Sequence, residues 1–260
     1  MDRDDARAVG RTAHERPESV DFERVAAGLS AEDSVVRVAL TEAVSTVARS
    51  DPDRVGQYLD ALEPCLADDD DAVRVNATHA FGAVAKSDPT RVTGYLAALV
   101  APLADAVAEV RRNATYAFGE VAKTEPDSVG SYLDALEPCL ADGTGGVRTN
   151  TAFVFRRVAE SDPGAVRPHV DALAGRLDDA NATVRRNVTL AFAGVAETDP
   201  DRVEPYLDAI EPRLGDTNER IRAAATAVFR AVGAADRFET GTKVYRPDGH
   251  REERPDSHRE

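Results

Sequence analysis

The sequence predicts an all-α protein built as an α-solenoid, in which short helix pairs repeat along the chain and stack on one another. Three observations lead to this fold. An acid–proline pair recurs every 37 residues, a Val/Ile–Arg pair keeps the same period, and two apolar helical stripes lie in each repeat. A repeat of this length with two helices is typical of a solenoid, because each pair buries its apolar faces only against its neighbours.

The acid–proline pair marks the start of the first helix of a repeat. Proline suits the first helical position, and the preceding carboxylate can cap the helix. Val55, Leu59, Leu62 and Leu66 then fall on one helical face. A second proline inside this helix, such as Pro64, removes a backbone hydrogen bond, so we expect a kink there. The pairs are Asp51-Pro52, Asp88-Pro89, Glu125-Pro126, Asp162-Pro163 and Asp199-Pro200.

The second helix of a repeat carries its own apolar stripe, formed in the first copy by Val36, Leu40, Ala43 and Val47. A short acidic turn separates it from the first helix. We count about six repeats in a solenoid over residues 17–237. The segments 1–16 and 238–260 lack the repeat and are expected to be disordered, charged tails. The repeats cover residues 17–49, 52–86, 89–123, 126–160, 163–197 and 200–234.

Each later turn also carries an aspartate, with an arginine six residues after it. Together with the helix pair and the interior proline, this pattern resembles the HEAT-repeat proteins, which are armadillo-like, right-handed α-solenoids. The resemblance implies that the aspartates and arginines form a structural ladder of bonds between adjacent repeats. The first copy departs from the pattern, with Ala31 in the aspartate position before Arg37. The ladder residues are Asp68, Arg74, Asp105, Arg111, Asp142, Arg148, Asp179, Arg185, Asp216 and Arg222.

The composition indicates a hydrated, acidic surface. The chain has 260 residues and a net charge of −15, from 47 Asp and Glu against 32 Lys and Arg. Many aspartates and few lysines resemble halophilic proteins, although an acidic surface could also recruit a basic partner. At about 1 M salt such long-range attraction is weak, because the screening length is only about 3 Å. The N-terminus is charged and no apolar run reaches the roughly 20 residues of a membrane span, so we expect a cytoplasmic protein that does not enter a membrane.

No constellation of residues predicts catalysis. His79 and His169 lie in different repeats, and neither has an acidic or cysteine partner at ligand spacing. Phosphate-binding and nucleophile-elbow glycine motifs are also absent from the sequence. We therefore expect no catalytic residue, no metal site and no cofactor.

The second helices are basic, although the chain is acidic. Six windows that begin at residues 36, 73, 110, 147, 184 and 221 hold 14 Lys and Arg against 4 Asp and Glu, and six of those 14 are the five ladder arginines and Arg37. On a helical wheel of the second helix, one position lies opposite the core stripe. Its residues in the six repeats form what we call the outer column: Glu42, His79, Tyr116, Phe153, Leu190 and Ala227. Either this column is an exposed binding surface, or superhelical curvature buries it between repeats.

The leading hypothesis is a non-catalytic protein–protein interaction scaffold that holds a partner segment in a concave groove. Tyr116 and Phe153 would anchor it, and arginines would pair with its carboxylates. The alternatives are a nucleic-acid-binding HEAT protein, which the net charge disfavours, and an accessory subunit related to the HEAT-like lyases that attach bilins. The candidate partner-binding residues are His79, Arg112, Tyr116, Phe153, Arg156, Arg186 and Leu190.

Overall fold

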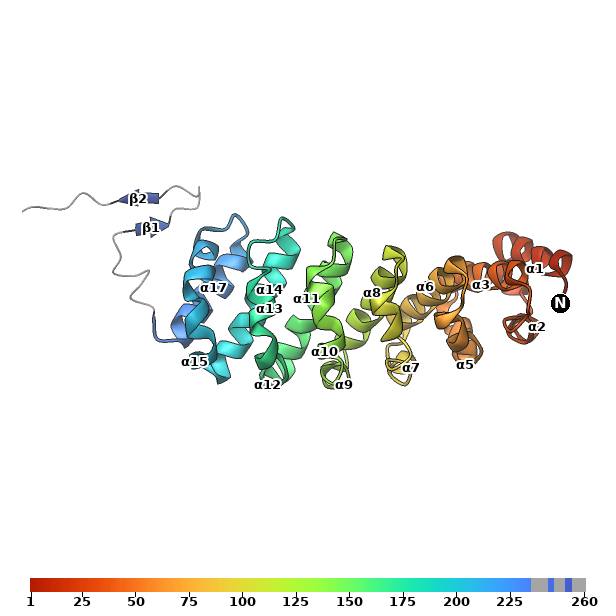
Figure 1. The fold of residues 1–260 in the computed structure, drawn as a ribbon, viewed down its shortest axis with the longest axis horizontal. Helices are drawn as coiled ribbons and strands as arrows, with labels where there is room; N and C mark the ends of the chain where they lie inside the picture. Colours follow the sequence, from red (N-terminus) through yellow and green to blue (C-terminus); the bar gives the residue numbers. More distant parts are fainter. Residues whose placement is uncertain (235–242, 246–250, 254–260) are drawn as a thin grey trace, which may run out of the picture. The chain divides into compact units, whose positions relative to one another are not determined.

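The protein is described by a computed structural model that defines residues 1–234, 243–245 and 251–253. The chain divides into two compact units, unit 1 (Met1–Cys139) and unit 2 (Leu140–Glu260). Within each unit, long helices alternate with short helical segments, as the ribbon in Figure 1 shows. The two units are described separately below.

Unit 1 is built on long helices that pack on one another in sequence order: α1 on α3, α3 on α6, and α6 on α8. These helices are α1 (Arg3–Glu15), α3 (Ser34–Ala48), α6 (Asp71–Ser87) and α8 (Ala108–Ala122). Short α-helical and 3₁₀ segments (the latter labelled η) run between them. They are η1 (Pro17–Ser19), α2 (Phe22–Gly28), α4 (Pro52–Val55), η2 (Gly56–Tyr58), α5 (Leu59–Leu62), η3 (Glu63–Ala67), α7 (Thr90–Thr93), η4 (Ala101–Ala104), α9 (Pro126–Gly130), α10 (Leu133–Leu136) and η5 (Glu137–Ala141), within which the unit boundary falls.

Unit 2 repeats this arrangement, with α11 packed on α14 and α14 on α17. The long helices are α11 (Gly145–Ser161), α14 (Ala182–Thr198) and α17 (Glu219–Ala231). The short segments are α12 (Pro163–Val166), η6 (Arg167–His169), α13 (Val170–Ala174), α15 (Pro200–Val203), η7 (Glu204–Tyr206), α16 (Leu207–Ile210) and η8 (Glu211–Gly215).

The first helix of each repeat begins at the acid–proline pair but is not one continuous helix. The Asp51 carboxylate accepts a hydrogen bond from the Arg54 N–H at 3.2 Å, and Pro52 occupies the first helical turn. The helix then passes into 3₁₀ geometry twice, at Gly56–Tyr58 and again at Glu63–Ala67, where Pro64 lies. The expected kink is therefore a series of breaks, the first of which precedes the interior proline.

The core of both units repeats one aromatic contact. From α6 to α14, one phenylalanine of each long helix is completely buried, and an aromatic ring from the following short segments packs on it. On Phe155 of α11 this ring is the buried imidazole of His169, and the two ring centroids lie 5.2 Å apart. His169 thus fills a position that tyrosine occupies elsewhere. The tyrosine pairs are Phe81–Tyr95, Phe118–Tyr132 and Phe192–Tyr206.

The N-terminal residues form a helix, which corrects the expected disorder of residues 1–16. Asp2 caps α1 by accepting from the Asp5 N–H at 2.8 Å, while Ala6 and Ala13 are buried. Two alanines give only a weak apolar pattern in the sequence. The helix is stabilised by packing on α3, which the sequence of α1 alone does not reveal. The Arg3 Nε also donates to Asp33 Oδ2 at 2.5 Å, which ties α1 to the start of α3.

Part of the expected C-terminal tail is paired. Strand β1 (Lys243–Tyr245) runs antiparallel to β2 (Arg251–Glu253), with Val244 opposite Glu252. These two strands correct the expectation of disorder for their own residues. The rest of the segment 238–260 lies outside the described residues.

Candidate binding face of the long helices

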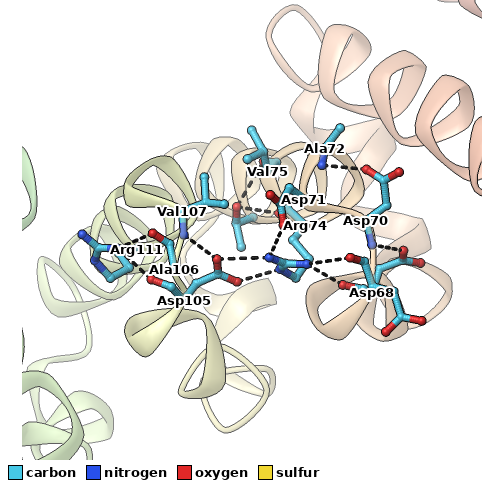
Figure 2. A network of polar contacts seen from close by, with 12 residues as sticks. Asp68, Asp70, Asp71, Ala72, Arg74, Val75, Asp105, Ala106, Val107 and Arg111 are labelled. Carbon is cyan, nitrogen blue, oxygen red and sulfur yellow. Dashed lines mark hydrogen bonds and ion pairs between the residues drawn. The ribbon is translucent and has the colours of Figure 1, made fainter.

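One edge of the long helices carries a ladder of aspartates and arginines, drawn around Arg74 in Figure 2. The Arg74 guanidinium donates from Nε to Asp105 Oδ2 at 2.6 Å and from Nη2 to Oδ1 at 3.2 Å. Its Nη1 reaches back to the main-chain oxygen of Asp68 at 2.7 Å. One arginine thereby joins its own turn to the turn of the next repeat, and the two-pronged geometry is the strong form of this ion pair.

The same bonds recur in both units. Arg37, Arg148 and Arg185 pair with the aspartates 31 residues ahead, Asp68, Asp179 and Asp216, at 2.6 to 3.0 Å. Arg37 also donates to the main-chain oxygen of Ala31 at 2.9 Å, a bond that needs no aspartate side chain. Four ladder arginines also donate from Nη1 to the main-chain oxygen of the aspartate six residues before them. These bonds join Arg111 to Asp105, Arg148 to Asp142, Arg185 to Asp179 and Arg222 to Asp216.

The ladder aspartates are held as anions. Burial by itself raises the pKa of Asp105, but the bonds from Arg74 and the Val107 N–H, with the charges of Arg74 and Arg111, outweigh it and lower the pKa below its ordinary value. The pKa values of Asp68, Asp179 and Asp216 are lowered by the same balance of causes. The ladder is therefore a set of satisfied charges, available for structure and not for a ligand.

A second strip of polar contacts joins neighbouring long helices. Asn76 Nδ2 donates to Thr41 Oγ1 at 3.4 Å, and Asn113 Nδ2 lies 3.5 Å from Thr78 Oγ1. Asn187 is the exception, because both of its polar side-chain atoms are buried without a hydrogen bond. The residue 35 positions before it is Ala152, where the earlier repeats have threonine.

The outer column is neither fully exposed nor fully buried. Glu42 and Ala227 are exposed, whereas His79, Tyr116, Phe153 and Leu190 are half-buried within their own units. The column therefore lies between the two outcomes that the sequence left open. Half-buried rings with an accessible edge can still contact a ligand, and they lose less side-chain freedom on binding than exposed ones.

In unit 1 the column opens into a cavity of about 490 Å³. His79 and Tyr116 lie on its wall, and Arg49 and Lys86 line it with exposed cationic side chains. Neither Arg49 nor Lys86 forms an ion pair with any of the described residues. Gly82 gives the Tyr116 ring room, since a Cβ there would lie 3.1 Å from Tyr116 Cδ1.

The two column residues of this cavity are uncharged near neutral pH. Burial lowers the pKa of His79, and the nearby Arg49 and Arg112 charges lower it further. Burial and a hydrogen bond to Glu120 raise the pKa of Tyr116 to about 12. The His79 Nδ1 lies 2.9 Å from Ser45 Oγ, but Ser45 is buried and is not among the residues that line the cavity. The pair orients the imidazole and presents no nucleophile.

In unit 2 the column residue Phe153 is covered by a guanidinium. The Arg156 Cζ lies 5.0 Å from the centroid of the Phe153 ring, a cation–π arrangement. The Arg156 Nε lies 3.3 Å from Glu160 Oε1, and the same Glu160 carboxylate pairs with Arg157. The Nε atoms of Arg156 and Arg186 are buried and make no hydrogen bond within the described chain.

The cations around the column therefore fall into two groups. Arg112 is paired with Glu109 at 3.2 Å, and Lys123 donates to the buried Glu120 at 2.5 Å, so these two side chains are engaged in their own helix. Arg49, Lys86 and Arg186 have no such acidic partner within the described part of the chain. Of the predicted arginines, Arg186 is accordingly better placed than Arg112 to meet an anion.

Neither a metal centre nor a membrane span emerges from the residues that the structure describes. Among them, His, Cys, Asp and Glu side chains form no group of three that could hold a metal ion. No helix within those residues combines the length and apolar character needed to cross a membrane.

Comparison with known proteins identifies the repeat. A family model described as GCN1-like, C-terminal HEAT repeats, matches residues 33–160, and one described as non-SMC mitotic condensation complex subunit 1 matches residues 126–204. The chain is a HEAT-repeat protein. No curated protein sequence matches it. As in other α-solenoids of this kind, the fold is typical of scaffolds in protein interactions.

Solved structures show the same all-α solenoid fold. A computationally designed armadillo repeat protein for modular peptide recognition is 22% identical, with a TM-score of 0.72 over 81% of this HEAT-repeat chain and 99% of that chain. A designed armadillo repeat protein in complex with the peptide (KR)4 is 21% identical, with a TM-score of 0.69 over 82% and 99% of the two chains. An engineered protein is 17% identical, with a TM-score of 0.71 over 83% and 97%.

Several residues of this HEAT-repeat face were missed from the sequence. Glu120 adds to the effect of burial in raising the pKa of Tyr116, and Ser45 orients His79. The first could have been found, because Glu120 follows Tyr116 by four residues on one helix, a spacing that brings side chains together. The second contact joins different helices and needs the packed structure.

Proposed function

We propose that the protein is a non-catalytic adaptor whose long-helix faces hold a segment of a partner protein. In unit 1 the contacts are His79, Arg112 and Tyr116, and in unit 2 they are Phe153, Arg156, Arg186 and Leu190. The observation that carries the proposal is the unit 1 cavity, where an aromatic wall meets two unpaired cations. Such a site fits an acidic segment with an apolar side chain.

The chemistry of the cavity favours binding over catalysis. An apolar or aromatic side chain of the partner would replace water on Tyr116 and His79, and buried rings of this kind give the largest share of binding energy. Carboxylates beside it would meet Arg49 and Lys86. A designed neighbour of the same fold holds the basic peptide (KR)4. The unpaired side chains of this cavity, Arg49 and Lys86, are cationic, so we expect it to bind an acidic peptide.

The test uses two labelled peptides of equal length at one fixed ionic strength. Each has a central leucine–phenylalanine pair, flanked by aspartate and glutamate in one and by lysine and arginine in the other. Fluorescence anisotropy should show tighter binding of the acidic peptide. Tyr116→Ala should weaken that binding at least tenfold, as expected for an aromatic anchor, and Lys86→Gln severalfold.

Two controls make the result specific. Arg11→Gln removes an exposed cation of α1 that has no ion pair with the described residues, and it should leave the affinity unchanged. Tyr116→Phe keeps the ring and should bind nearly as well as the wild type. Equal binding of both peptides, or full binding by Tyr116→Ala, contradicts the proposal. Tighter binding of a single-stranded oligonucleotide, with the steep salt dependence of counterion release, would assign the face to nucleic acid.

A further inference from the structure

Three arginines from three successive long helices of unit 2 lie close enough for two of their charges to act on the third. Arg156 lies on α11, Arg186 on α14 and Arg220 on α17, and these helices pack on one another in that order. Arg186 and Arg220 both act electrostatically on Arg156. Burial lowers the pKa of Arg156, and the neighbouring charges of Arg157, Arg186 and Arg220 lower it further, against the opposing effect of Glu160.

The positive charge at this place is not balanced by the chain. Arg186 and Arg220 form no ion pair with any residue that the structure describes, and Arg156 shares the single carboxylate of Glu160 with Arg157. The ladder of the same helices is the contrast, since Arg148 and Arg185 each meet an aspartate of their own. Like charges placed together without a counter-charge destabilise a fold, and they mark a site where an external anion can supply the difference.

Hydrogen-bond donors without acceptors concentrate at the same place. Among the described residues, the buried Nε atoms of Arg156 and Arg186 both lack a hydrogen-bond acceptor, although the Arg156 Nε approaches Glu160 Oε1 at 3.3 Å. A buried donor without an acceptor costs on the order of 1–3 kcal/mol, so such groups are uncommon unless something else bonds to them. The Arg156 Cζ lies 5.0 Å from the centroid of the Phe153 ring, and this contact supports the Arg156 guanidinium before a ligand arrives.

We infer that Arg156, Arg186 and Arg220 form a binding site for a phosphomonoester dianion, either a phosphorylated side chain of a partner or free phosphate. A carboxylate is satisfied by one guanidinium in a two-pronged pair, whereas a phosphomonoester carries close to two negative charges and three acceptor oxygens. Three separate guanidinium groups match that demand. The inference refines the proposed function at the unit 2 face, but its test uses different residues and probes, so either can fail alone.

The experiment is isothermal titration of the full chain at constant ionic strength in potassium chloride. The probes are inorganic phosphate, a phosphoserine peptide and the same peptide with glutamate in that place. Phosphate and the phosphopeptide should bind, and the glutamate peptide at least tenfold more weakly than the phosphopeptide. A phosphopeptide that binds more tightly than phosphate identifies a protein side chain as the source, and equal affinities identify free phosphate.

Variants connect that binding to the three arginines. Arg186→Gln and Arg220→Gln should each weaken phosphate binding about tenfold, the loss expected for one charged hydrogen bond. Arg186→Lys keeps the charge but loses the two-pronged guanidinium geometry, so its affinity for phosphate should lie between those of the wild type and Arg186→Gln. Arg11→Gln is the matched control and should bind as the wild type does. Circular dichroism confirms that each variant is folded.

Two results would overturn the inference. One is phosphate binding that is absent, or that the Arg186→Gln and Arg220→Gln variants retain in full while folded. The other is an oligonucleotide, whose phosphodiesters carry one charge each, that binds through the same arginines more tightly than the phosphopeptide does.

Discussion

The ladder and the outer column lie on the same long helices, but they differ in how their charges are matched. Along the ladder the residue types repeat, and each of Arg37, Arg74, Arg148 and Arg185 meets a carboxylate at 3.0 Å or less. Along the column the residue type changes at every repeat, and nearby cations such as Lys86 have no ion pair within the described chain. Repetition thus marks a contact that each repeat needs to stack, and variation marks positions that stacking leaves free for a ligand.

Acid tests the ladder as a whole, and we expect its effect on stability to be the largest. The pKa values of Asp68, Asp105, Asp179 and Asp216 are lowered in the folded chain, so unfolding lets these carboxylates take up protons more readily. Their contribution is complete above the ordinary aspartate pKa of about 3.9 and is lost as the pH falls through the lowered values. Urea unfolding should show a nearly constant free energy from about pH 7 to 5 and a steep loss below about pH 4.

The arginine variant provides the control for this titration. In Arg74→Leu the Asp105 carboxylate loses its main partner, so its pKa moves back up and its share of the acid-dependent loss disappears. The variant should therefore lose less free energy between about pH 5 and pH 3 than the wild type does. An identical acid loss in both proteins would show that the ladder carboxylates do not set the acid limit.

Breaking one rung should give the next largest effect. Arg74→Leu leaves the nearly buried Asp105 carboxylate without its counter-charge, and removal of one member of such a pair costs about 3 kcal/mol or more. The unfolding free energy at pH 7 reports the loss. Asp71→Asn is the matched control, because Asp71 is an exposed partner of the same guanidinium and should cost less than about 1 kcal/mol. Equal losses in the two variants would mean that burial of the pair is unimportant.

Repairing the interrupted asparagine strip should stabilise the protein modestly. Repeats with Asn-Ala-Thr give the next asparagine a hydroxyl, whereas residues 150–152 read Asn-Thr-Ala and leave Asn187 without one. The exchange Thr151→Ala with Ala152→Thr keeps the composition and should raise the unfolding free energy by about 1 kcal/mol. The gain should vanish when Asn187→Ala is added. A gain that persists without Asn187 would contradict this account.

The sequence predicts the repeated features of this fold well. The 37-residue period locates the long helices and the buried Phe81 and Phe118, because every copy reports the same contact. Features that occur once are harder to predict. Helix α1 gains its stability from α3 and has only two buried alanines of its own, so no repeated apolar pattern predicts it.

The candidate site shows the same limit. The helical wheel selects Tyr116 and Phe153 correctly as residues off the core stripe, but it cannot state how far neighbouring helices cover them. It also treats Arg112 and Arg186 alike. The pair of Glu109 and Arg112 could be expected from their spacing of three residues on one helix, whereas only the packed structure shows that Arg186 has no acidic partner in the described chain.

The smallest effect on stability should come from the column cations, and it is the sharpest test of the contrast with the ladder. Lys86 and Arg49 are exposed and make no ion pair with the described residues, so Lys86→Gln and Arg49→Gln should each change the unfolding free energy by less than about 0.5 kcal/mol. The same variants should weaken binding of the acidic peptide. Arg74→Leu should still bind that peptide as long as the variant is folded. A loss above about 1 kcal/mol in Lys86→Gln would make the column a second structural strip, since a side chain that stacking leaves free cannot support stacking.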